Sequence, residues 1–220
     1  LFAQCKSLET VTIGDDVTLE DYAFNMDKDE SFEIKSYDEN GEKYFYYTFQ
    51  TALTSLTIGD NVVLGENAFA NAHSLESVTL GANAEIGKMA FYNNSSLKNI
   101  DLSKAVSIGD YAFSGCTELT TVTMADTVSK IRAQAFMDTP NLTSIELSAN
   151  LESISSDAFN SSGLTRIYLP EGLRSIGTQA FCNTPLTAIE IPDSVTSIAQ
   201  GAFYRCTELA SVKLPADLEE

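Results

Sequence analysis

The stretch AFSGCTELTTVTMADTVSKIRAQAF, residues 112–136, begins and ends on the same dipeptide. Ala-Phe occurs eight times in the 220-residue chain, at Ala23-Phe24, Ala68-Phe69, Ala90-Phe91, Ala112-Phe113, Ala135-Phe136, Ala158-Phe159, Ala180-Phe181 and Ala202-Phe203. From Phe69 onward, each of these phenylalanines follows the previous one by 22 or 23 residues. A period of this length is typical of a solenoid, in which each repeat contacts only its neighbours. We therefore expect residues 1–220 to form a single solenoid domain.

Apolar residues occupy fixed positions within each repeat. In residues 113–136 the positions expected to be buried are Phe113, Cys116, Leu119, Val122, Met124, Val128, Ile131 and Ala135. The same positions in the preceding repeat are Phe91, Asn94, Leu97, Ile100, Leu102, Val106, Ile108 and Ala112. Val122 and Met124 are two residues apart, which is the spacing of a strand with one buried face. Residues 119–124 are therefore expected to form a short strand that pairs in parallel with the strands of neighbouring rungs.

A residue that turns the chain follows each expected strand. It is glycine early in the chain and proline late, at Gly14, Gly59, Gly81, Pro170, Pro192 and Pro215. A second apolar pair then follows, such as Val195 and Ile198, and indicates a second strand or extended side. The Ala-Phe pair comes next and is expected to pack into the core, before a short helical or irregular turn returns to the next strand. We expect about ten such rungs of 22–23 residues.

The complete pattern, Ala-Phe-x-x-Cys-x-x-Leu-x-x-Val-x-Ile-Pro-x-x-Val-x-x-Ile-Gly-x-x-Ala-Phe, resembles the BspA-type leucine-rich repeats of bacterial cell-surface proteins. The best matches are residues 2–24, 69–91, 113–136 and 203–220, and the resemblance covers nearly the whole chain except about residues 25–46. It implies a right-handed, curved leucine-rich-repeat solenoid. Both ends of the chain fall inside a repeat and lack the polar caps of a solenoid, so we expect an excerpt of a longer protein.

The same resemblance carries expectations about location and partners. It implies a secreted or surface-exposed bacterial protein, and therefore an extracellular or cell-surface location. Some members of the family are linked to adhesion to host extracellular-matrix proteins such as fibronectin and fibrinogen. A role in adhesion is thus an analogy from the fold, because one fold hosts many functions.

The repeat pattern fails between residues 24 and 47. Strand-forming residues flank Asn40-Gly41 on both sides, which is typical of a β-hairpin. We therefore expect a hairpin inserted at about residues 25–48. The alternative is a degenerate rung with Phe32 and Ile34 in the strand positions.

Two tyrosines in this segment are candidate binding residues. Tyr44 and Tyr46 would point to the same side of the second hairpin strand. Exposed tyrosines on a hairpin suit contacts with a protein or a glycan. The alternative is that they cover the core at an irregular rung.

Composition excludes several classes of partner. The formal net charge is −18 and the isoelectric point is near 4.2. Such a chain repels phosphate backbones, which proteins bind by neutralising them with lysine and arginine. Nucleic acid and anionic membranes are therefore not expected partners, and no apolar run approaches the roughly 20 residues needed to span a bilayer.

Neither a catalytic nor a metal site is expected. The chain has one histidine, His73, and no pairing of it with a serine or cysteine is apparent. Residues 25–29 resemble the start of a calcium loop, but Glu30 stands at its sixth position and Ser36 at its twelfth, which favours a solvated acidic turn. The four cysteines form no CxxC motif, and a Cys182–Cys206 disulfide between rungs is conceivable. We expect no enzyme activity, metal or cofactor.

Outward-facing strand residues give two columns along the expected sheet. One column runs Thr12, Thr57, Thr79, Asp101, Thr123, Glu146, Tyr168, Glu190, Lys213, and the other runs Thr10, Ser55, Ser77, Asn99, Thr121, Ser144, Arg166, Ala188, Ser211. The early part is a ladder of threonine and serine, good strand residues whose hydroxyls can pair across strands. The late part is different in character. We name Glu146, Arg166, Tyr168, Glu190 and Lys213 the C-terminal patch.

The C-terminal patch is the best candidate for a recognition surface. Tyrosine and arginine are favoured at interface hot spots, although an ordinary solvated face with charge pairs across strands is the alternative. The sequence therefore predicts a non-enzymatic binding or adhesion module for a protein or glycan partner. The alternative function is a structural spacer that displays another domain away from the cell.

Overall fold

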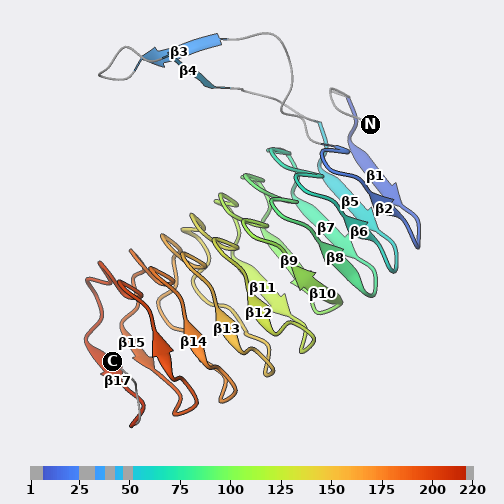
Figure 1. The fold of residues 1–220 in the computed structure, drawn as a ribbon. Helices are drawn as coiled ribbons and strands as arrows, with labels where there is room; N and C mark the ends of the chain where they lie inside the picture. The colour runs from blue at the N-terminus through green and yellow to red at the C-terminus, as the bar shows by residue number, and fades with distance from the viewer. Residues whose placement is uncertain (1–6, 25–32, 38–42, 47–51, 217–220) are drawn as a thin grey trace.

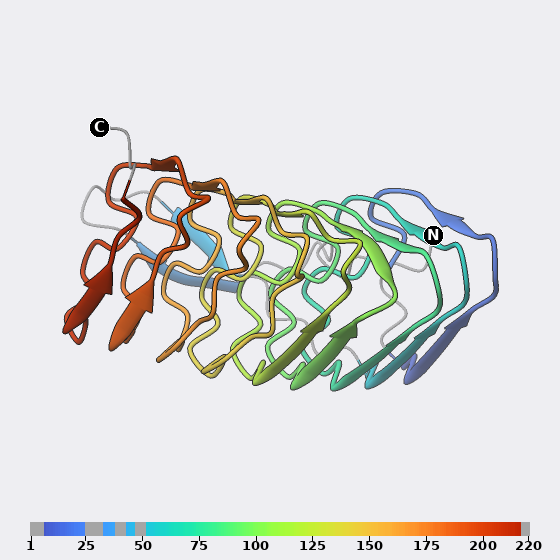
Figure 2. The same cartoon turned by 90° about the horizontal axis from the view of Figure 1, so that it is seen from below.

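A computed structural model describes residues 7–24, 33–37, 43–46 and 52–216, with the backbone alone described for 33–37 and 43–46. The repeats wind into an elongated solenoid whose short parallel strands follow one another along its length (Figure 1, Figure 2). The described ranges contain no helix. The return turns are therefore irregular, which was one of the two forms expected, and the predicted leucine-rich-repeat solenoid is confirmed.

One side of the solenoid carries a continuous parallel sheet in the order β1-β5-β7-β9-β11. Its strands are β1 (Thr10–Ile13), β5 (Ser55–Ile58), β7 (Ser77–Leu80), β9 (Asn99–Leu102) and β11 (Thr121–Met124). Toward the C-terminus the same side continues through a single bridge between Thr123 and Glu146, and then through the pair β15 (Ala188–Glu190) and β17 (Ser211–Lys213). We call the outward surface of all these strands the sheet face.

The second apolar pair of each repeat forms the expected second strand. One parallel sheet contains β2 (Thr18–Leu19), β6 (Val63–Leu64), β8 (Ala84–Ile86) and β10 (Ala105–Ile108). Another contains β12 (Lys130–Ile131), β13 (Ser153–Ile154), β14 (Ser175–Ile176) and β16 (Ser197–Ile198). Each rung thus has two extended sides with apolar residues facing inward.

The phenylalanines of the Ala-Phe pairs form one stack through the core. Seven successive ring pairs link the eight phenylalanines, with ring centroids 4.8 to 5.9 Å apart and interplanar angles of 12° or less. The six phenylalanines from Phe69 to Phe181 are fully buried. Alanine beside each ring is also buried and small enough for the next rung to approach closely. The stack of eight is close to the expected number of rungs.

The return turns add a third set of bonds between rungs. Asn71 and Asn93 have positive φ angles of 62° and 58°, and Gly115 has the same left-handed geometry at 75°. Asparagine and glycine adopt this conformation at low cost. The Asn71 N–H donates to the Tyr92 carbonyl at 2.8 Å, and the Asn93 amide donates to the Asn71 side-chain oxygen at 2.9 Å. Each turn is therefore tied to the next.

The position three residues after each core phenylalanine takes a small buried side chain, as expected. Ala72, Asn94, Cys116 and Thr139 all have no exposed surface there. The Thr139 hydroxyl donates to the Phe136 carbonyl at 2.8 Å, and the Asn94 side-chain oxygen accepts from the Ala72 N–H at 2.8 Å. The buried Ser162 hydroxyl, at the same position, has no hydrogen-bond partner in the described chain. Cysteine serves here as a small apolar residue. Cys182 and Cys206, like Cys116, are free thiols.

One expected core position was wrong. Val106 is 36% exposed, whereas its neighbour Ala105 is fully buried. The turn after Leu102 is one residue shorter than the turn after Met124, so the next inward position falls on residue 105 instead of 106. The structure shows the same offset as an irregular pairing between Ala105 and Ser107 in the β10–β8 register.

Strands of the expected hairpin region pair in antiparallel fashion. β3 (Glu33–Tyr37) and β4 (Lys43–Tyr46) pair from Glu33 opposite Tyr46 to Tyr37 opposite Lys43, with a shift in register between Ile34 and Ser36. Meanwhile β1 pairs directly with β5, which lies 45 residues further along the chain. The segment therefore adds no strand between β1 and β5.

Candidate functional site

The C-terminal patch lies on the sheet face, as its spacing predicted. Glu146 pairs with Thr123 through a parallel bridge, and Glu190 lies opposite Lys213 in the β15–β17 register. Tyr168 belongs to the rung between Glu146 and Glu190, and its side chain is 80% exposed. Arg166 lies two residues before it and is also exposed. These side chains come from four successive rungs, so the fold brings together residues that are 67 positions apart in sequence.

The backbone ladder opens beneath this patch. Rungs are joined just before it, where the Thr165 N–H donates to Thr143 and the Thr187 N–H donates to Thr165, both at 3.2 Å. From residue 166 to residue 169, by contrast, no backbone group of this described stretch has a hydrogen bond. These residues form no assigned strand, although Ile167 and Leu169 still point into the core at 6% and 9% exposure.

The change of turn residue from glycine to proline accounts for part of this opening. In the early rungs the turn glycine continues the ladder, because the N–H of Gly59 donates to Ile13 at 2.9 Å and that of Gly81 donates to Ile58 at 2.7 Å. Pro170 and Pro192 occupy the same position in the late rungs. Proline has no N–H, so the bond that would close the strand end is lost.

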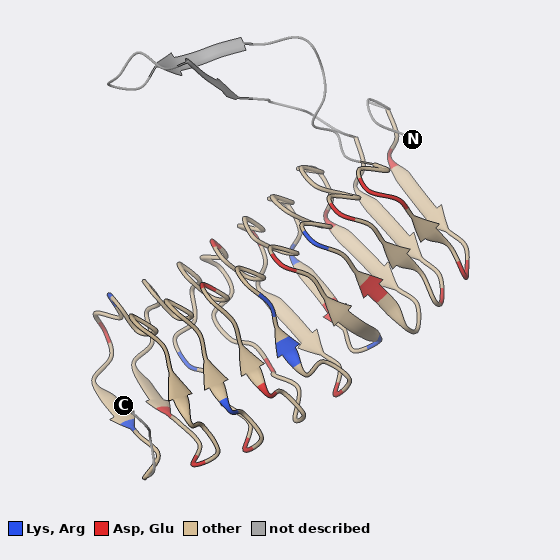
Figure 3. Ribbon diagram, in the orientation of Figure 1, with Lys and Arg blue, Asp and Glu red and all other residues tan. Residues whose placement is uncertain are grey.

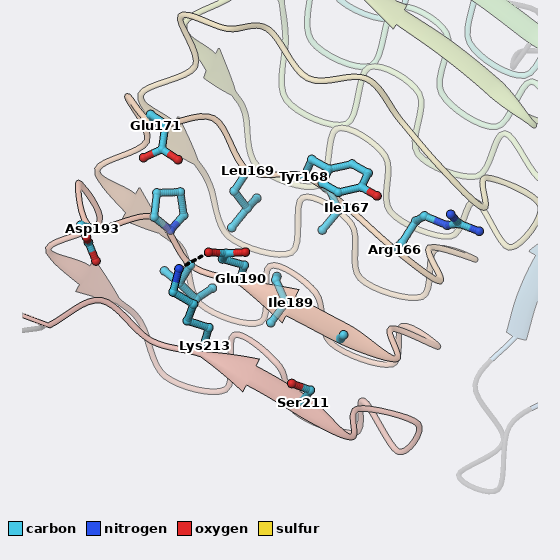
Figure 4. A pocket seen from close by; sticks show the side chains of 13 residues that line it. Arg166, Ile167, Tyr168, Leu169, Glu171, Ile189, Glu190, Asp193, Ser211 and Lys213 are labelled. Carbon is cyan, nitrogen blue, oxygen red and sulfur yellow. Dashed lines mark hydrogen bonds and ion pairs between the residues drawn. The ribbon is translucent and has the colours of Figure 1, made fainter.

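Two shallow hollows lie beside Tyr168 where the ladder is open. The larger has a volume of about 530 Å³ and lies between Tyr168 and the Glu190–Lys213 pair, with Arg166 at one end (Figure 4). The smaller, of about 340 Å³, lies between Tyr168 and the strand residues Thr121 and Thr123. All five residues of the C-terminal patch line one hollow or the other.

Two acidic residues of the larger hollow were not singled out in the sequence. Glu171 and Asp193 line it from the turns below the strands, each directly after a proline, at Pro170 and Pro192. The signal that could have found them is this repeated proline–acid pair. The two outward columns contain strand positions alone and therefore do not include these turn residues.

An ion pair spans the end of the larger hollow. The Lys213 ammonium donates to the Glu190 carboxylate, and both side chains are about two-thirds exposed. This hydrogen bond and the charge of Glu190, with smaller contributions from Asp193 and Glu171, raise the pKa of Lys213. An exposed pair of this kind holds its partners weakly.

The early part of the sheet face is different. Strands β5 and β7 carry no charged residue. Acidic residues instead lie in turns along the length of the solenoid (Figure 3). Thr57 and Thr79 are exposed and in register. Their hydroxyls have no hydrogen-bond partner within the part of the chain that is described, so the expected pairing across strands does not form. The threonines serve the ladder through their β-branched shape.

The remaining sequence candidates are placed as follows. The backbone of Tyr44 and Tyr46 lies in β4, but their side chains, and the whole of residues 25–29, lie outside the described part. His73 is in a return turn, where its ring Nδ1 lies 3.4 Å from the Ser95 hydroxyl. Among the described residues, no group of three or more potential ligands is arranged for a metal ion. Nor does any helix in that part have the length and apolarity of a membrane span.

Comparison with family models places the whole pattern in one family. The model described as BspA type leucine-rich repeat region matches in six copies, over residues 1–98, 39–162 and 129–220. The chain therefore belongs to the BspA-type leucine-rich repeat family. No curated protein matches it significantly.

Solved structures of bacterial repeat proteins share the fold. A leucine-rich repeat protein from T. pallidum has a TM-score of 0.60 and 26% identity, covering 84% of this chain and 80% of that one. A leucine-rich cell surface protein from Faecalibacterium prausnitzii has a TM-score of 0.56 and 24% identity, covering 77% of this chain and 62% of that one. A Bacteroides ovatus repeat protein has a TM-score of 0.59 and 21% identity, covering 98% and 63%. The chain thus spans under two thirds of the length of the last two proteins.

Proposed function

We propose that this chain is a non-enzymatic, extracellular binding module of a bacterial surface protein, which presents the C-terminal patch to a protein or glycan partner. The observation that carries the proposal is the gathering of the patch around two hollows beside the exposed ring of Tyr168. Host extracellular-matrix proteins are the first partners to test. The similarity to a protein described as a cell surface protein supports an extracellular location.

Three features of the patch support recognition rather than plain solvation. A tyrosine that is 80% exposed offers a large, rigid contact area at low entropic cost. Hollows on both sides of it allow a ligand to contact the ring from either neighbouring rung. Arg166 extends from the same rung and has no ion-pair partner in the described residues. Tyrosine and arginine are the residue types that contribute most at interface hot spots.

The continuous core supports a structural spacer as the second candidate function. A single stack of phenylalanines joins every described rung from Phe24 to Phe203. A continuous solenoid of this kind holds another domain at a distance without binding a ligand of its own. A spacer and a binding module therefore share the same core and differ only in what the sheet face does.

Binding of the purified chain to immobilised fibronectin, fibrinogen and a glycan panel tests the proposal. It is run at two salt concentrations beside the double variant Arg166→Ala, Tyr168→Ala, with Thr57→Ala, Thr79→Ala as the matched control on the early part of the sheet face. We expect saturable binding that falls about 30-fold or more in the first variant, which corresponds to about 2 kcal/mol. The control should bind as the parent chain does.

Each other outcome has a defined meaning. If both double variants retain binding, the C-terminal patch is not the binding site. Tyr44 and Tyr46 are then the next residues to test. No binding by the parent chain to any member of the panel would favour the spacer. Circular dichroism of each variant separates loss of contact from loss of folding.

A further inference from the structure

The larger hollow carries more information about its ligand than the smaller one. It is bounded by Tyr168, by the Glu190–Lys213 pair and by the acidic turn residues Glu171 and Asp193. Its carboxylates gather toward one end along the strand direction, with Lys213 beside them. Arg166 lies near the start of its strand stretch, whereas Glu171 and Asp193 lie beyond the strand ends (Figure 4).

Length and shape of the hollow suit an extended chain. From Arg166 to Leu169 the backbone covers roughly 10 Å at about 3.3 Å per residue. Ile167, Ile189 and Ile191 also line the hollow, although they are at most 6% exposed. A ligand there consequently meets backbone as well as outward side chains.

We propose that the larger hollow binds an extended polypeptide segment of about five residues that carries a lysine or arginine, a ligand assignment that rests on the proposed function. The basic side chain lies among Glu171, Asp193 and Glu190, where it competes with the weakly held Lys213. An adjacent side chain of the segment packs on the Tyr168 ring. Neutral glycans lack the cation that three carboxylates favour.

Charge complementarity supports this choice over an acidic segment. Three carboxylates and two cations line the hollow, so its side chains carry a net formal charge of −1. The chain as a whole carries a net charge of −18. A basic segment is therefore attracted at long range and again inside the hollow.

Selection of random linear octapeptides displayed on phage tests the proposal without a known partner. The full chain is the immobilised target, and selected peptides are synthesised with a fluorescent label for titration. We expect enrichment of lysine and arginine, and affinity that falls about tenfold or more in Glu171→Gln, Asp193→Asn and in Tyr168→Ala. The control Glu118→Gln, Glu208→Gln, which removes the same charge from return turns, should bind almost as the parent chain does.

Several results would overturn the assignment. These are failure to select any peptide, a consensus without basic residues, or equal affinity for Tyr168→Ala. If the parent chain binds a neutral glycan and the Tyr168→Ala variant does not, the assignment of a basic polypeptide ligand is overturned. The proposed function is then intact. Loss of all binding at the C-terminal patch, by peptides and glycans alike, would remove both.

Discussion

Strands β5 and β7 present Thr57 and Thr79 on a closed ladder, whereas the equivalent stretch at residues 166–169 presents Arg166 and Tyr168 over an open one. The core beneath both regions is the same. Phe69 and Phe159 are each fully buried and stacked on their neighbours with similar geometry. The comparison shows that buried positions determine the solenoid, and that outward positions and the turn residue are free to differ from rung to rung.

Because both regions share one core, large-to-small substitutions in either region should lower the free energy of unfolding by the same amount. Phe91→Ala and Phe159→Ala should each lower the free energy of unfolding by about 3–5 kcal/mol, because each leaves a cavity in a stack that is fully buried. Urea unfolding followed by circular dichroism measures both. A cost that is several-fold smaller in one region would show that the two regions do not share one continuous core.

At the turns, by contrast, we expect glycine-to-alanine substitutions in the early and late rungs to affect stability differently. A Cβ added at Gly81 would lie 2.2 Å from the Gly59 carbonyl oxygen, whereas one added at Gly172 would find its nearest neighbour at 3.9 Å. Gly81→Ala should therefore destabilise the chain by about 1–3 kcal/mol. Gly172→Ala should be neutral or stabilising by up to about 1 kcal/mol, since it restricts the unfolded chain. Equal effects in urea unfolding would contradict the close approach of rungs at the early turns.

Cysteines at one repeat position allow a comparison of a central rung with the last one. Burial raises the pKa of the Cys116 thiol to about 12, while Cys206 is only half-buried. The thiolate is the reactive species, so iodoacetamide at pH 8 should modify Cys206 in the native protein and leave Cys116 unmodified, as read by mass spectrometry of peptides. The raised pKa also means that stability falls as pH rises from the ordinary thiol value, about 8.5, toward 12. Equal labelling rates would show that central rungs open as readily as the last.

The smallest effect is expected at the Glu190–Lys213 pair. Glu190→Gln should change stability by less than about 1 kcal/mol, because the pair is exposed. It should also lower the pKa of Lys213 toward its ordinary value, since Glu190 is the main cause of the upward shift. Nuclear magnetic resonance titration of the lysine side chain measures the change. An unchanged pKa would mean that the other carboxylates, and not Glu190, hold the ammonium.

Much of the fold follows from the sequence because burial repeats. Every position expected to be buried between Phe113 and Ala135 is buried. Val106 was wrong because a turn that is one residue shorter shifts every later position, and a fixed count from the preceding phenylalanine does not detect it. Counting back from Ala112 would have given Ala105.

The site was predictable only in part. Outward columns gave Glu146, Tyr168 and Glu190 correctly as neighbours, because strand alternation is local and regular. The open ladder at residues 166–169 could not be predicted in the same way. The opening is an absence of hydrogen bonds between rungs, which depends on how neighbouring rungs are placed. Ile167 and Tyr168 are residue types that are common in strands, so the sequence at these positions predicts an ordinary paired strand. Proline at the turn was visible in the sequence, but its consequence for the neighbouring rung required the structure.

Amide hydrogen exchange of the native protein tests most directly whether one core supports two different faces. The amides of residues 167–169 should exchange about tenfold or more faster than those of residues 56–58, because the former lack hydrogen bonds while the latter lie inside a paired strand. Protection of Phe91 and Phe159 should be similar, since both amides bond to the next rung at 3.0 and 2.8 Å. Equal protection of residues 167–169 and 56–58 would contradict the open ladder, and with it the structural basis of the hollow beside Tyr168.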